Sequence, residues 1–350
     1  MVRTRAWLFG LIYCLALWSS LCFFGASATA QTASAAPNVP TTKDAAASVA
    51  AGDLQRAENE LQAILQASPT DVHALNLLAI VRVQQKREDE AELLFKQAIR
   101  IQPDFAGAHS GLGLLYAQMG KNDLAIPSLQ ESLKLDPGRK DVLAVLIGIW
   151  RKQAHDAAEH GDLEQALALL MDARKLDQGD ADVQYEFGMV ALRMSLYSDA
   201  IDAFNQVLKL RPDDAAALYG LGRAKMSVSR FDDAQQAFER YVQRRPMDAS
   251  GHYALGFTYQ ALQRTSDARA EYERSIAIQP QQTESGFQLG LMELEEGNAR
   301  VAAARFEQVL KRAPQHAGAL TGMGRVKFQE KDFAGAASLF EKAKIGRAHV

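Results

Sequence analysis

The feature that most constrains the fold of this chain is a repeat of 34 residues, for which the segment from Ala181 to Asp214 serves as a template. An alanine marks the twentieth position of each repeat: Ala57, Ala91, Ala125, Ala166, Ala200, Ala234, Ala268, Ala302 and Ala336. The spacing of these alanines is 34 residues, apart from one step of 41 residues. A fixed period of this length predicts one array of stacked units, so the length of 350 residues does not indicate a number of globular domains.

Three other positions repeat in phase with the alanines. A large apolar residue lies four places later, at Leu61, Phe95, Leu129, Leu170, Phe204, Phe238, Tyr272, Phe306 and Phe340. Most repeats end with a proline, and six have glycine at the eighth position: Gly113, Gly188, Gly222, Gly256, Gly290 and Gly324. Small residues let two helices approach closely, and proline disfavours continuation of the second helix. We therefore expect two helices in each repeat and no strands.

This pattern resembles the tetratricopeptide repeat, which combines a 34-residue period with an aromatic-glycine signal in its first half and Ala, Phe and Pro in its second half. The resemblance covers residues 38–344 and comprises nine repeats. It implies an all-α fold at residues 43–344: a tetratricopeptide-repeat α-solenoid, in which antiparallel helix pairs form a right-handed superhelix. Such solenoids bind extended partners on the concave surface formed by their leading helices.

The resemblance also implies that the fifth and ninth positions of each repeat face this groove. Four consecutive repeats carry aromatic rings at the fifth position and mostly apolar residues at the ninth. The expected partner-binding residues are Tyr185, Met189, Tyr219, Arg223, Tyr253, Phe257, Phe287 and Leu291. These residues predict a track for an extended or helical peptide of a protein partner. The alternative is that the rings only pack along the groove.

Charge is expected to contribute less than apolar contact to this recognition. Family members that hold a terminal carboxylate use groove lysines, arginine and asparagines, whereas the corresponding places here carry mostly Tyr, Met, Leu and Ser. The formal net charge of −3 does not favour nucleic acid as a partner.

Met1 to Ala30 resembles a secretory leader, with Arg3 and Arg5 before an apolar run and small residues at the end. We expect a periplasmic or secreted bacterial protein. The alternative is an uncleaved leader that anchors the chain in the inner membrane, facing the periplasm. Both cysteines, Cys14 and Cys22, lie in the leader, so the processed chain would lack disulfides and thiolate chemistry.

Two segments interrupt the regular pattern. Residues 31–42 are rich in Ala, Ser, Thr and Pro and predict a flexible linker. The seven extra residues near 140–150 add about two helical turns, so we expect a lengthened leading helix at residues 141–159. Its apolar residues favour packing against the preceding helix pair over a separate docking surface.

No catalytic, cofactor or metal site is expected from the sequence. His155 and His160 are five residues apart, which is not the spacing of a zinc-binding helix. The glycines follow the repeat and do not form a phosphate-binding loop after a strand. The sequence therefore predicts a non-catalytic scaffold for protein–protein interaction.

The last six residues, Ile345 to Val350, break the repeat pattern, and their codons can be written as a common sequencing-adapter sequence. We expect this tail to be non-native. Two alternatives to a simple scaffold remain open: the array is the substrate-binding arm of a larger enzyme such as a glycosyltransferase or peptidase, or it self-associates.

Overall fold

The computed structural model describes residues 40–348, with side chains through Lys344. This part of the chain forms eighteen α-helices and no strand. The predicted leader and residues 31–39 of the predicted linker lie outside the described residues, as do the side chains of the predicted tail. The last residue of the predicted linker, Thr42, is already helical, because Thr41 caps α2. The last helix runs on to Ala348, four residues beyond the expected end of the repeats.

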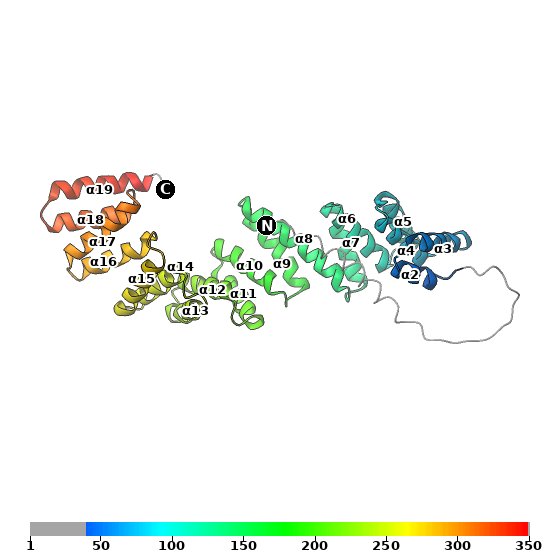
Figure 1. The fold of residues 1–350 in the computed structure, drawn as a ribbon, viewed down its shortest axis with the longest axis horizontal. Coiled ribbons are helices and arrows are strands. Elements are labelled where there is room, and N and C mark those ends of the chain that lie inside the picture. The colour runs from blue at the N-terminus through cyan, green and yellow to red at the C-terminus, as the bar shows by residue number, and fades with distance from the viewer. Residues whose placement is uncertain (1–39, 349–350) are drawn as a thin grey trace. The chain divides into compact units, whose positions relative to one another are not determined.

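The chain divides after Glu159 into two compact units, and Figure 1 labels the helices of each. The first unit contains α2 (Thr42–Ala50), α3 (Leu54–Ala67), α4 (Val72–Gln84), α5 (Glu88–Ile101), α6 (Ala106–Gln118), α7 (Asn122–Leu135) and α8 (Lys140–Glu159). The second contains α9 (Leu163–Leu176), α10 (Ala181–Arg193), α11 (Tyr197–Leu210), α12 (Ala215–Ser227), α13 (Phe231–Arg244), α14 (Ala249–Ala261), α15 (Thr265–Ile278), α16 (Thr283–Glu295), α17 (Ala299–Arg312), α18 (Ala317–Gln329) and α19 (Phe333–Ala348).

Each unit is a stack of helix pairs. The two helices of a repeat contact each other, as in α4–α5 and α12–α13, and the trailing helix also contacts the next leading helix, as in α5–α6 and α11–α12. Leading helices of successive repeats touch as well: α4 with α6 in the first unit, and α10 with α12 in the second. The predicted all-α repeat fold is confirmed, and its leading helices form a continuous layer within these stretches.

Local sequence signals determine where the helices begin and where the turns lie. Asp180 caps α10 by accepting hydrogen bonds from the backbone N–H groups of Asp182 and Val183. Within a repeat, the turn between the two helices requires a left-handed backbone conformation, which glycine adopts without steric cost. Gly52, Gly120, Gly161 and Gly297 supply it in four repeats, with φ between 73° and 86°.

Aromatic rings on trailing helices connect one repeat to the next. Phe204 is fully buried between Gly188 of its own repeat and Gly220 of the following repeat. A Cβ atom would lie 2.9 Å from the Phe204 ring if added to Gly188, and 2.5 Å from it if added to Gly220. The ring therefore occupies the space that the two missing side chains leave, as expected from the pairing of small and large positions.

Helix α8 contains the seven-residue insertion. It has 20 residues, whereas the complete leading helices α4, α6, α10 and α12 have 13. Val142, Leu146, Ile147 and Trp150 are buried, and α8 contacts both α6 and α7. The added turns thus contribute apolar side chains to the packing of the first unit.

A buried ion pair joins the first two repeats. Arg82 on α4 is 5% exposed, and its Nη1 lies 2.6 Å from Oε2 of Glu58 on α3. The Gln85 side chain donates to the same carboxylate at 2.8 Å and accepts from Arg82. The hydrogen bonds from Arg82 and Gln85, together with the arginine charge, lower the pKa of Glu58 to about 2.

This lowered pKa makes the stability of the first unit dependent on pH. An unpaired glutamate has a pKa of 4.5, so the stabilisation by ionised Glu58 is complete above about pH 4.5 and decreases as the pH falls towards 2. The shift corresponds to about 2 kcal/mol after allowance for partial solvent screening. At pH 7 the wild type should have a higher free energy of unfolding than Glu58→Gln. We expect this difference to be smaller by about 2 kcal/mol at pH 2. Urea denaturation of both proteins across this range measures the difference, and a gap that does not change with pH would contradict the assignment.

Candidate functional site

The four aromatic residues at the fifth position lie in the second unit, and each is half-buried on its leading helix. Each ring packs against the large ring on the trailing helix of its own repeat. The pairs and their centroid distances are Tyr185–Phe204 at 6.0 Å, Tyr219–Phe238 at 5.7 Å, Tyr253–Tyr272 at 5.9 Å and Phe287–Phe306 at 6.2 Å. One side of every ring is thus held by the core, which fixes its orientation.

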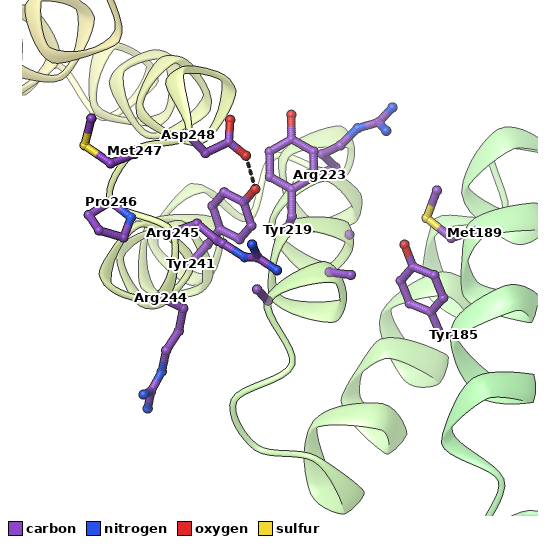
Figure 2. A pocket seen from close by; sticks show the side chains of 13 residues that line it. Tyr185, Met189, Tyr219, Arg223, Tyr241, Arg244, Arg245, Pro246, Met247 and Asp248 are labelled. Atoms are coloured by element: carbon purple, nitrogen blue, oxygen red, sulfur yellow. Dashed lines mark hydrogen bonds between the residues drawn. The ribbon is translucent and has the colours of Figure 1, made fainter. Parts of the chain in front are cut away.

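A cavity of about 650 Å³ lies beside two of these rings. Three segments line it: α10, α12, and the end of α13 with the turn that leads into α14. The residues are Tyr185, Met189, Ala215, Ala216, Tyr219, Gly220, Arg223, Tyr241, Arg244, Arg245, Pro246, Met247 and Asp248. Figure 2 shows Tyr185 and Met189 on one side of the cavity, and Tyr241 with the turn on the other.

The cavity brings together half of the residues predicted for partner binding. Tyr185, Met189, Tyr219 and Arg223 line it. The other four predicted residues lie outside it. Tyr253 and Phe257 contact each other with ring centroids 6.3 Å apart, Phe287 packs on His316, and Leu291 packs against the apolar core around α17 and α18.

Sequence reasoning missed the residues that the α13–α14 turn contributes. Tyr241, Pro246, Met247 and Asp248 belong to a trailing helix and its following turn, whereas the family resemblance directed attention to leading helices. The run Arg244–Arg245 before a proline was the available signal, because it places two cations at the end of a helix beside the groove.

The turn is fixed to the helices on both sides of it. Asp248 caps α14, with Oδ1 accepting from the backbone N–H of Ser250 at 2.9 Å. Its other oxygen accepts a hydrogen bond from the Tyr241 hydroxyl, drawn as a dashed line in Figure 2. Burial raises the pKa of Tyr241, and the adjacent carboxylate raises it further, so this phenol remains a hydrogen-bond donor.

The side chain of His252 also contacts this turn. Its Nε2 lies 3.0 Å from the carbonyl oxygen of Pro246, and its Nδ1 lies 2.6 Å from Oε2 of Glu271 on α15. Both side chains are buried. The two ring nitrogens thus connect the turn to α15. Gln184 in an earlier repeat makes the equivalent backbone contact, donating to the carbonyl of Gln178 at 3.2 Å.

We expect His252→Ala to lower the free energy of unfolding by about 2 kcal/mol, because Glu271 loses a buried partner. The same change should speed hydrogen exchange at the amide of Asp248, which donates to the carbonyl oxygen of Arg245. His252→Gln is the matched variant, since glutamine can keep the contact with Pro246 as Gln184 does with Gln178. Exchange at the turn should be as slow in this variant as in the wild type. Equal exchange rates in the wild type and both variants would disprove the role of His252.

Within residues 40–348, no helix is long and apolar enough to cross a bilayer. In the same part of the chain, no group of three His, Cys, Asp or Glu side chains is placed to hold a metal ion.

Three family models match the sequence, and each describes a tetratricopeptide repeat. They match residues 48–115 and 191–255, residues 106–139 and 249–282, and residues 287–349. The chain belongs to the tetratricopeptide-repeat family. The cavity therefore lies in the fifth and sixth repeats of a tetratricopeptide array, on the leading helices α10 and α12 and the turn before α14.

Several curated proteins match part of the chain. The human protein O-mannosyl-transferase TMTC3 is 35% identical over 81 residues, which is 23% of this chain and 9% of that protein. The human PEX5-related protein is 25% identical over 165 residues, covering 46% of this chain and 26% of that protein. The chain thus spans well under two thirds of the length of these relatives. Among solved structures, MamA 41-end from Desulfovibrio magneticus RS-1 has 23% identity and a TM-score of 0.47, covering 48% of this chain and 96% of that one.

Proposed function

We propose that this tetratricopeptide array is a non-catalytic scaffold that binds an extended segment of a protein partner in the cavity between α10, α12 and the α13–α14 turn. The observation that carries the proposal is the cavity itself. Its volume of about 650 Å³ is within the range of ligand-binding sites, and four residues predicted from the sequence to face the groove line it.

The packing of the rings favours binding over a purely structural role for this part of the groove. Tyr219 contacts Phe238 and Tyr241, with centroid distances of 5.7 and 5.0 Å, but it still lines the cavity. A ring that is already held in place loses little conformational entropy when a partner covers its free side. Tyr185 and Tyr219 can therefore act as rigid contact surfaces.

A second candidate function is that the array selects substrates for an enzyme of which this chain is one part. A match between this chain and a segment of the human protein O-mannosyl-transferase TMTC3 favours it, because that relative is named as a transferase. An exported location is also part of the proposal and rests on the leader-like residues 1–30. A gene that continues into a region of alternating strands and helices would favour the enzyme.

Binding at the cavity can be tested with peptides selected by the full chain from a random displayed library of about twelve residues. Met189→Ser removes an apolar side chain that lines the cavity, and we expect it to weaken the selected peptides about tenfold. Met171→Ser is the matched control, because Met171 is 45% exposed on α9 and does not line the cavity. Equal affinities for both variants, or no selected peptide at all, would contradict the proposed function.

A further inference from the structure

The cavity contains more hydrogen-bond donors and positive charge than the leading-helix positions predict. Three arginines line it, Arg223, Arg244 and Arg245, but only one carboxylate, Asp248. Arg244 is paired with Asp213, and Figure 2 shows its side chain directed away from the other labelled residues. Asp248 already accepts from Tyr241 and from the backbone of Ser250. Both of these donors are neutral and leave the charge of Asp248 in place, so the three arginines, Asp213 and Asp248 together leave a net charge of +1 at the cavity.

Arg223 and Arg245 are both exposed, and neither guanidinium makes an ion pair or a hydrogen bond with the described residues of the chain. Guanidinium groups stay charged at all physiological pH values and have donors arranged to bind a carboxylate through two parallel hydrogen bonds. Both groups line one cavity, so an anion that enters it finds a guanidinium donor from α12 and another from the α13–α14 turn.

The neighbouring hydroxyl groups add to the same preference. Burial raises the pKa of Tyr185 and of Tyr219, so both phenols keep their protons. Neither hydroxyl has a hydrogen-bond partner among the described residues. The cavity thus offers unpaired donors from two arginines and two tyrosines. Both oxygens of its one side-chain carboxylate already accept hydrogen bonds. The cavity therefore suits an anionic, acceptor-rich ligand group better than a cation or an amide.

Apolar surface lies next to these donors. Met189 projects from α10, and Met247 on the turn is 75% exposed. A ligand that fits the whole cavity must therefore combine an anionic group with an apolar side chain. Resting on the proposed function, we infer that the cavity binds an acidic segment of the partner, with an Asp or Glu carboxylate between Arg223 and Arg245 and a neighbouring apolar side chain against Met189 and Tyr185.

The peptides selected by the full chain provide the first test. They should be enriched in Asp or Glu next to a large apolar residue. A synthetic peptide of this kind should lose about tenfold in affinity when its acidic residue is changed to Gln or when the protein carries Arg223→Glu and Arg245→Glu. Its affinity should also fall as the salt concentration rises.

The matched control carries Arg300→Glu and Arg312→Glu, which change the net charge equally at exposed positions outside the cavity. This control should bind the acidic peptide as the wild type does, and circular dichroism should show that both double variants remain folded. Selected peptides that bind at the cavity but lack acidic residues would overturn this inference and leave the proposed function standing. An equal loss in the control would also overturn it, as would tighter binding of a phosphoserine peptide, which would point to a phosphate site.

Discussion

Replacing Phe204 with alanine is expected to lower the free energy of unfolding of the second unit by about 3–5 kcal/mol. The side chain is fully buried, and its ring fills the space between Gly188 and Gly220. Neither glycine has a side chain that could fill the space left by the substitution, so the contacts of the ring with both the fifth and the sixth repeat are lost. Urea denaturation followed by circular dichroism measures the effect.

Phe340 provides the control at the same repeat position. It packs close to Gly324 of its own repeat, but it is 38% exposed, whereas Phe204 is fully buried. Phe340→Ala should therefore cost less than half as much as Phe204→Ala. Equal losses for the two variants would show that the ring does not stabilise the array by joining consecutive repeats.

The second large effect is expected at the ion pair between the first two repeats. Arg82→Ala leaves the buried carboxylate of Glu58 without its main partner, and we expect a loss of about 3 kcal/mol in the free energy of unfolding of the first unit. Gln85 and Arg87 remain near this carboxylate, but neither replaces a buried guanidinium.

The array itself suggests a rescue for this variant. Arg269 and Glu293 pair between the seventh and eighth repeats at the corresponding positions, with the two charges exchanged. The double variant Glu58→Arg with Arg82→Glu should therefore recover part of the lost stability. A double variant as unstable as the sum of its two single variants would mean that the pair itself contributes nothing.

The sequence predicted the fold well because the repeat encodes it locally. The period specifies both helices of each repeat, and α10 begins at Ala181, the first residue of the template. The extra length of α8 followed from the one irregular spacing between the alanines. These features depend on helical periodicity and on turns, which act over a few residues.

The candidate site was only partly predictable, because it depends on contacts between repeats. The leading-helix positions led to Tyr185 and Tyr219, but no local pattern shows that the turn after α13 closes the other side of the cavity. Whether Arg245 has an ion-pair partner depends on which carboxylates already bind other groups. Asp248 is engaged by Tyr241, a residue of another helix, and only the structure shows this contact.

The central claim is that the cavity formed by α10, α12 and the α13–α14 turn binds the partner. Hydrogen exchange of the full chain, with and without a saturating amount of the selected acidic peptide, tests it most directly. The account predicts slower exchange in α10, in α12 and at the turn residues Met247 and Asp248, and Arg223→Glu with Arg245→Glu should remove this protection. Unchanged exchange rates in these three segments while the peptide is bound would contradict the claim.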